Sequence, residues 1–233
     1  MSDDPTRPFG EASAAFVSAP AYRQLDAHQH VDEATALARI MFSNQSVSHI
    51  EVGRASDIIK HFGSLAGVLN ASAIDLDKQG IDIATFYMLQ AVNASILHVL
   101  QAEIKKGPLI SSWDAVTEYL TATMAHHKQE RFKILYLDRK NRLIADENQS
   151  IGTVDHVPVY PREVAKRALE LDASAIILAH NHPSGDPRPS SEDINMTAQI
   201  VEACEAIGVR VHDHAIVGHN GEVLSMRTEG LCP

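Results

Sequence analysis

The sequence contains little cysteine: two residues in 233, Cys204 and Cys232, and no Cys-x-x-Cys pair. Small secreted domains held together by disulfides, and closed zinc sites built from thiolates, both need several cysteines at short spacings. The sequence therefore argues against both classes. With 45% hydrophobic residues, the chain can instead bury an apolar core of its own.

Membrane-spanning apolar runs, a signal peptide and a basic excess are also missing. Uninterrupted apolar runs fall well short of the roughly 20 residues that cross a bilayer. The first residues, MSDDPTRPFGEAS, lack the basic-then-apolar order of a secretory signal. We therefore expect a cytoplasmic protein without a membrane partner. The net charge of −10 argues against broad affinity for nucleic acid, which depends on neutralising phosphates, although a local basic patch remains open.

The clearest chemistry lies in residues 179–193, AHNHPSGDPRPSSED. The apolar run before it, Ala175 to Leu178, predicts a buried strand. His180 and His182 are two residues apart, so their side chains should point to one side just past the strand end. A loop rich in proline and glycine follows, and Ser190 then begins a helix with Asp193 in its first turn. Two histidines and a carboxylate fit a catalytic zinc site whose fourth position is open to water.

Each of these residues also has a purely structural interpretation. Ser190 and Asp193 fit a capping box, with a serine at the N-cap and an acidic residue three positions later. An HxH pair can arise by chance in a chain with 13 histidines. The strand, the HxH pair, the stiff loop and the acidic helix start nevertheless occur in the order that a metal site needs. We therefore favour His180, His182 and Asp193 as metal ligands.

The chain is predicted to have three parts. Residues 1–22 are small and polar, and we expect a disordered leader. Residues 23–106 show only helical patterns, including a long helix from Ala84 to Ile104, and predict a small helical domain. Residues 112–233 alternate helices with strands, which predicts an α/β domain around one sheet. Strands are expected at Phe132–Leu137, Leu143–Glu147, Ala175–Leu178 and Val209–Val217, and helices are expected to begin at Ser112, Pro161 and Ser190.

The pattern His180-x-His182, seven residues, Ser190-x-x-Asp193 resembles the JAMM signature of the JAB/MPN+ metallohydrolases. The surrounding sequence, with its HNHPSG, PxPSxxD and DHxIVG elements, is similar to the RadC branch of that superfamily. The resemblance is strong over about residues 112–231 and weak over 25–103. It implies a JAB/MPN-like α-β-α sandwich related to the cytidine deaminase fold, preceded by a small all-α domain.

The resemblance also implies a mechanism. JAMM enzymes use a glutamate near an early strand as general base, and Glu130, at the start of ERFKILYLD, matches that place. Spacing alone does not separate Glu130 from Glu147 or Glu163. Ser190 would help to stabilise the oxyanion that forms when water attacks a carbonyl. Zinc held by His180, His182 and Asp193 would activate that water.

A second HxH motif, His212-Asp213-His214, lies in the last long strand. A second metal site is one interpretation. We favour a supporting role, because the matching residues of the RadC pattern are not JAMM ligands. Asp213 would then orient a ligand histidine by accepting its free ring N–H.

The helical part resembles the N-terminal domain of RadC proteins, which carries a helix-hairpin-helix-like element; Phe62–Ser72 matches best. Such hairpins bind phosphate through backbone N–H groups, and their glycines permit close approach. Where that family has Gly-Ile-Gly, this chain has Gly80-Ile81-Asp82. The bulk and charge of Asp82 argue against DNA binding here and favour a packing or dimerising role, which leaves a homodimer open.

Two enzymatic functions remain open at this point. The first is a zinc-dependent peptidase or isopeptidase with a polypeptide substrate. The second is a nuclease that acts on DNA with Mn²⁺ or Mg²⁺, which suits the family's association with DNA repair. A non-catalytic scaffold is disfavoured because every ligand of the motif is present. A zinc deaminase is disfavoured because the chain lacks the H-x-E and P-C-x-x-C motifs of that class.

Overall fold

The computed structural model describes residues 31–42, 46–109, 113–151, 159–219 and 221–232. The chain divides into two compact units. The first comprises the chain up to Val68 together with Ala73–Phe86, and the second comprises Leu69–Ser72 and the chain from Tyr87 onward. The division falls within the long helix, whereas the sequence suggested a boundary at residue 106. The predicted leader, residues 1–22, lies outside the described residues.

The first unit is helical, as its sequence patterns predict. Its helices are α2 (Glu33–Phe42), α3 (His49–Phe62), α4 (Leu65–Leu69) and α5 (Ala73–Lys78). The apolar side chains of Leu37, Ala55 and Leu76 are fully buried among them. The predicted glycine at the end of α3 is confirmed: Gly63 has φ of 86°, a conformation that side chains with a Cβ rarely adopt.

Asp82 precedes the long helix α6 (Ile83–Lys105) and caps it. Its Oδ1 accepts a hydrogen bond of 2.7 Å from the backbone N–H of Thr85, and this bond lowers the pKa of the carboxyl group. The backbone donor that a phosphate could use is therefore occupied by a fixed negative charge. That the Gly80-Ile81-Asp82 turn does not bind DNA stays a prediction.

Among the residues that the structure describes, α6 is long and apolar enough to cross a membrane by length and composition. The sequence was expected to contain no such segment, but α6 contains no Asp, Glu, Lys or Arg before Glu103. One helix of this kind is only weak evidence for a membrane span, because core helices of soluble proteins meet the same criteria.

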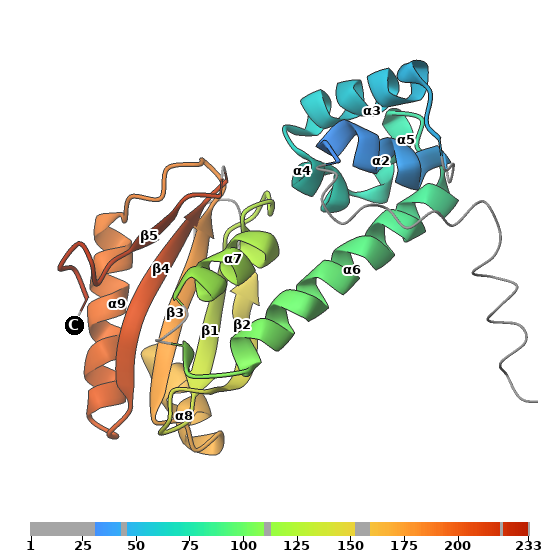
Figure 1. The fold of residues 1–233 in the computed structure, drawn as a ribbon. Coiled ribbons are helices and arrows are strands. Elements are labelled where there is room, and N and C mark those ends of the chain that lie inside the picture. Colours follow the sequence, from blue (N-terminus) through green and yellow to red (C-terminus); the bar gives the residue numbers. More distant parts are fainter. Residues whose placement is uncertain (1–30, 43–45, 110–112, 152–158, 220, 233) are drawn as a thin grey trace, which may run out of the picture. The chain divides into compact units, whose positions relative to one another are not determined.

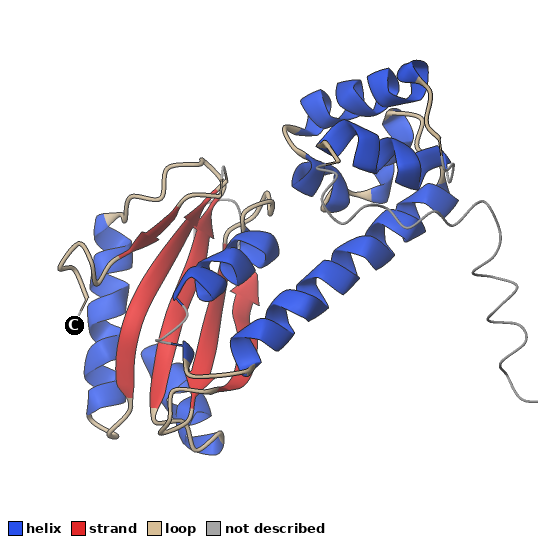
Figure 2. Ribbon diagram, in the orientation of Figure 1, coloured by secondary structure: helices blue, strands red, loops and turns tan. Residues whose placement is uncertain are grey.

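The second unit is built on a five-stranded sheet (Figures 1 and 2). Its strands are β1 (Arg131–Leu137), β2 (Leu143–Ile151), β3 (Ala175–His182), β4 (Arg210–Gly218) and β5 (Val223–Ser225), and its helices besides α6 are α7 (Trp113–Met124), α8 (Pro161–Glu170) and α9 (Ser191–Glu205). The strand order is β2-β1-β3-β4-β5. Only β3 and β4 are parallel, and the other neighbouring pairs are antiparallel.

Helices cover both faces of this sheet. On one face, α8 and α9 pack through Val164, Ala168 and Ile200 onto β-strand residues that include Ile134 and Ile176. On the other face, α7 packs through Val116 and Leu120 onto a second set of strand residues. Alternation along each strand divides its side chains between these two cores. The predicted α/β unit is therefore a three-layer arrangement (Figure 2).

The parallel pair brings the motif residues together. Parallel strands need a crossover connection, and here α9 joins β3 to β4. The loop after β3 therefore leads directly into the N-terminus of α9, close to the end of β3. Asp193, in the first turn of α9, is placed next to the histidines that end β3.

Candidate metal centre

The sequence predicted that His180 and His182 lie just past the end of β3. In the structure, both histidines lie within the strand. His180 pairs with Phe132 of β1 and with Ile216 of β4, so hydrogen-bonded neighbours extend the strand beyond its apolar residues. Both histidines share the sheet face of Ile176 and Leu178, toward α9. His180 is almost fully buried, and the side chain of His182 is 16% exposed.

Four side chains converge at this point: Glu130, His180, His182 and Asp193. Their candidate ligand atoms all lie within 4.8 Å of one another. The Nε2 atoms of His180 and His182 are 2.9 Å apart, and Oδ1 of Asp193 is 3.2 Å from Nε2 of His180. Within the described part of the chain, this is the group of histidine, cysteine and acidic residues that could hold a metal ion.

A buried relay fixes which nitrogen His180 presents. Thr197 donates its hydroxyl proton to the backbone carbonyl of Asp193 (2.6 Å). The Thr197 hydroxyl oxygen therefore accepts a hydrogen bond from Nδ1 of His214 (2.6 Å). Burial holds the pKa of His214 well below its ordinary value, so this ring is neutral and its Nε2 is an acceptor. That nitrogen lies 2.8 Å from Nδ1 of His180, which must carry the proton. Nε2 of His180 is left with a free lone pair facing the site.

His182 is oriented in the same way by the loop that follows it. Its Nδ1 lies 2.7 Å from the carbonyl oxygen of Asp186, which can only accept a hydrogen bond. The loop returns to this position through a turn in which the N–H of Gly185 bonds to the carbonyl of His182. Gly185 has φ of 97°, which explains the glycine of HNHPSG. The Nε2 atoms of both histidines are thus free acceptors that point into one site.

Asp193 has two oxygens with different partners. Oδ2 accepts hydrogen bonds from the backbone N–H (2.8 Å) and the hydroxyl (2.6 Å) of Ser190, while Oδ1 faces His180. Burial alone would raise the pKa of Asp193, but the adjacent His180 and His182 rings and the hydrogen bonds from Ser190 outweigh it and hold the pKa well below its ordinary value. A carboxylate with one oxygen held and the other free suits binding through a single oxygen.

Ser190 is the N-cap of α9. Its hydroxyl accepts from the backbone N–H of Asp193 (3.1 Å), and its own backbone N–H donates to Oδ2 of Asp193 (2.8 Å), which completes a capping box. The structural interpretation of Ser190 and Asp193 is therefore confirmed. It does not compete with the chemical one, because the cap also fixes the orientation of the Asp193 carboxylate.

Glu130 is the outermost member of the group. It directly precedes β1, its side chain is 17% exposed, and its Oε1 lies 3.9 Å from Nε2 of His180. The other two glutamates that the sequence left open lie elsewhere: Glu147 pairs with Arg167 of α8 at 2.9 Å, and Glu163 pairs with Arg162 at 3.2 Å. The structure brings only Glu130 of these three to the histidines.

Asn181 lies between the two histidines, and sequence reasoning gave it no role. Its side chain points to the opposite face of the sheet and is completely buried. Oδ1 accepts from the backbone N–H of Arg131 (2.9 Å), and Nδ2 donates to the carbonyls of His127 (3.3 Å) and Gln129 (3.2 Å). The amide therefore holds the segment that contains Glu130. The missed signal was that the middle residue of an HxH strand must face away from the site.

The second HxH motif has divided roles. His214 contacts His180 directly, so the predicted supporting role belongs to His214. The prediction that Asp213 orients a ligand histidine is wrong. Asp213 faces the α7 side, where it accepts hydrogen bonds from Ser225 (2.5 Å) and from the backbone N–H of Arg227 (3.0 Å).

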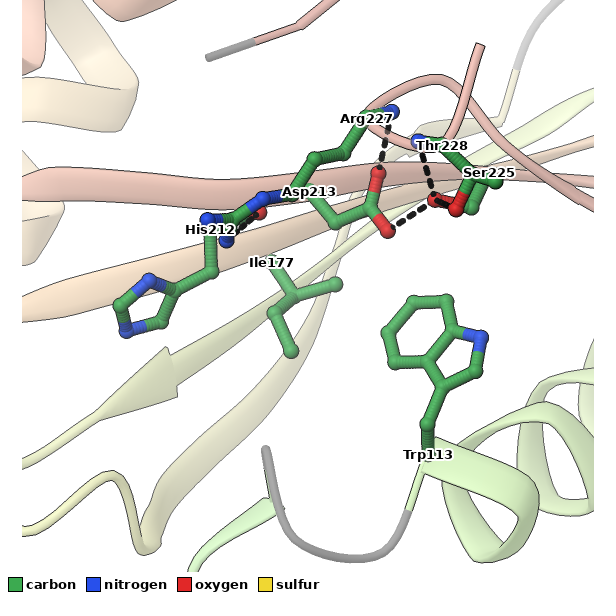
Figure 3. Close-up of a pocket in the computed structure, with 7 residues that line it drawn as sticks. All are labelled: Trp113, Ile177, His212, Asp213, Ser225, Arg227 and Thr228. Atoms are coloured by element: carbon green, nitrogen blue, oxygen red, sulfur yellow. Dashed lines mark hydrogen bonds between the residues drawn. The ribbon is translucent and has the colours of Figure 1, made fainter. Parts of the chain in front are cut away.

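Asp213 and His212 instead line a pocket of about 200 Å³ on that other face (Figure 3). Trp113 and Ile177 supply its apolar walls, and Arg227 and Thr228 lie beside Asp213. The ring of His212 bonds to Oδ1 of Asn141 at 2.8 Å. The pocket is separated from His180 and His182 by the sheet itself.

Comparison with known proteins agrees with this geometry. The family model described as "RadC-like JAB domain" matches residues 110–231. The UPF0758 protein SPO0054 of Ruegeria pomeroyi is 54% identical over 174 residues, which cover 74% of this chain and 77% of that protein. A UPF0758 protein of Rhodobacter capsulatus is 52% identical over 178 residues, 76% of this chain and 83% of that protein. A mixed sheet with helices on both faces fits such a domain.

The relay behind His180 gives a prediction of its own. Thr197→Val keeps the shape of the side chain but removes the oxygen that accepts from His214. His214 can then exchange its ring proton, and His180 loses its fixed tautomer. We expect affinity for zinc to fall by about 10- to 100-fold, measured by competition with a chromophoric chelator. Unchanged affinity with normal folding would show that His180 keeps its tautomer without the relay.

Proposed function

This chain belongs to the RadC-like JAB domain family, a group of metal-dependent hydrolases, and we propose that it is a zinc-dependent hydrolase of amide bonds in polypeptides, a metallopeptidase or isopeptidase. The observation that supports this most directly is the convergence of two histidine Nε2 atoms, one free carboxylate oxygen and a separate glutamate. The proposed ligands are His180, His182 and Asp193. Glu130 and Ser190 are the proposed catalytic residues.

The donor set fits zinc. Ligand atoms about 2.0 Å from a tetrahedral zinc ion are about 3.3 Å apart. Here Nε2 of His180 lies 2.9 Å from Nε2 of His182 and 3.2 Å from Oδ1 of Asp193. Imidazole and carboxylate donors suit zinc, and hard ions such as Mg²⁺ prefer oxygen ligands. Both imidazoles are held in the tautomer that a metal requires, by His214 and by the carbonyl of Asp186.

A bound zinc ion would polarise the substrate carbonyl and make water acidic enough to attack it near neutral pH. The protein's own part is the transfer of the proton. Oε1 of Glu130 lies 3.9 Å from Nε2 of His180, beyond the ligand triad, and can accept a proton from the attacking water and deliver it to the leaving amine. The Ser190 hydroxyl, now directed at Asp193, would turn toward the oxyanion.

The proposed substrate class, a polypeptide, has one alternative, which is DNA. The same ligands could serve a nuclease that uses Mn²⁺ or Mg²⁺. The net charge of −10 and the capped turn at Asp82 favour a polypeptide over DNA. A cytoplasmic location is part of this proposal.

The test is a substrate panel for the wild-type protein. Fluorescent peptides, lysine-linked isopeptides and labelled single- and double-stranded DNA are each incubated with Zn²⁺, Mn²⁺, Mg²⁺ or EDTA. We expect cleavage of amide substrates with Zn²⁺, loss of that cleavage with EDTA, and no cutting of DNA. Metal-dependent DNA cutting without amide cleavage would overturn the peptidase assignment and make the protein a nuclease.

A further inference from the structure

We infer that Asn181 is the positioning residue for Glu130, an inference that rests on the proposed function of this site. The geometric basis is the end of the β1–β3 ladder. The last backbone pair of these strands is Phe132 with His180, and the next residue of β1, Arg131, donates its N–H to the Asn181 side chain instead. The amide thus continues the ladder where backbone pairing stops.

Glu130 lies between two groups that the amide holds. The residue before it, Gln129, supplies a carbonyl acceptor at 3.2 Å, and the residue after it, Arg131, supplies an N–H donor at 2.9 Å. A third bond reaches the carbonyl of His127 at 3.3 Å. Both amide hydrogens and the amide oxygen are therefore used, on backbone atoms of one short segment.

The placement on the strand connects this segment to the metal ligands. Asn181 is covalently flanked by His180 and His182, and its side chain emerges on the opposite face of β3. Strand β3 therefore supplies two of the proposed ligands, and the residue between them holds the segment that carries the general base. A shift of about 1 Å in a reacting group can reduce a rate by about 100-fold, so the loss of this anchor should affect the chemical step.

The anchor is buried, so its removal also carries a stability cost. Removing the amide leaves its backbone partners on His127, Gln129 and Arg131 without these hydrogen bonds, which destabilises the fold. A control must reproduce that destabilisation without touching the site. Ile176→Ala is suitable, because Ile176 is a fully buried residue of the same strand whose side chain packs in the core.

The experiment compares Asn181→Ala, Asn181→Asp and Ile176→Ala, all loaded with zinc chloride. We expect Asn181→Ala to lower kcat by about 100-fold with little change in KM or zinc affinity, and Ile176→Ala to leave kcat near wild type. Asn181→Asp keeps an acceptor for Arg131 but removes both donors, so kcat should fall while the Arg131 amide stays protected from hydrogen exchange. In a Glu130→Gln background, Asn181→Ala should cause no further loss.

Two outcomes would overturn the inference. One is an equal loss of kcat from Asn181→Ala in the wild-type and Glu130→Gln backgrounds, since Asn181 would then act independently of Glu130. The other is unchanged hydrogen exchange in residues 127–131 of Asn181→Ala. The exchange measurement does not need a substrate. If the wild type cleaves no amide, the proposed function fails, while exchange still decides whether Asn181 holds this segment.

Discussion

Replacing Glu130 with glutamine is expected to lower kcat for amide hydrolysis by about 10²- to 10⁴-fold while zinc remains bound at full occupancy. The substitution preserves the size of the side chain but removes its ability to accept a proton. Glu130 is the most distant member of the cluster, 3.9 Å from His180, and the other three side chains suffice as ligands. The measurement pairs steady-state kinetics with metal analysis of the same sample.

A matched control is Glu163→Gln, because Glu163 lies on α8 and pairs with Arg162 away from the cluster. Its kcat should equal that of the wild type. Loss of zinc together with activity in Glu130→Gln would make Glu130 a ligand and contradict its role as a base. Full activity with full zinc occupancy would place the general base on another residue.

The order of elements in the second unit could be predicted from sequence because local signals agree there. Pro161 begins α8, Ser190 caps α9 and the apolar runs of β1 and β3 form the centre of the sheet. The end of β3 was predicted less well. His-Asn-His has no strand composition, and only the backbone partners in β1 and β4 keep it extended.

The convergence of His180, His182 and Asp193 could be predicted because it follows from short-range rules. Residues two apart in a strand share a face, and a capping box places an acidic residue in the first turn of a helix. The resemblance to JAMM enzymes added Glu130, which spacing alone did not distinguish from other glutamates. Its proximity to His180 depends on the antiparallel pairing of β1 with β3.

The residues behind the ligands were hidden by an irregularity in β4. The register of β3 and β4 shifts between Ile176 and Ile177, which pair with Val211 and Asp213. Simple alternation would put Val211 and His214 on opposite faces, yet both lie on the α9 side. Such a bulge is set by the tertiary structure, so the sequence favoured Asp213 where the structure has His214.

Replacing His180 with alanine is expected to abolish zinc binding and the stabilisation that zinc provides. His180 is the central donor, within 3.2 Å of both His182 and Asp193, and its removal leaves two ligands. For the wild type, zinc at a thousand times its Kd should stabilise the fold by about 4 kcal/mol, a rise of about 10 °C in the Tm of the zinc-sensitive transition. The measurement is differential scanning calorimetry with zinc chloride or EDTA.

The matched variant is His212→Ala, which removes a histidine of the other HxH motif. His212 bonds to Asn141 and lines the pocket on the opposite face of the sheet, so its loss should leave the zinc-induced rise in Tm intact. A rise that persists in His180→Ala but disappears in His212→Ala would move the metal to the second motif. A rise lost only in His180→Ala would place the metal at the carboxyl end of β3, where two strand residues and one helix start supply all three ligands.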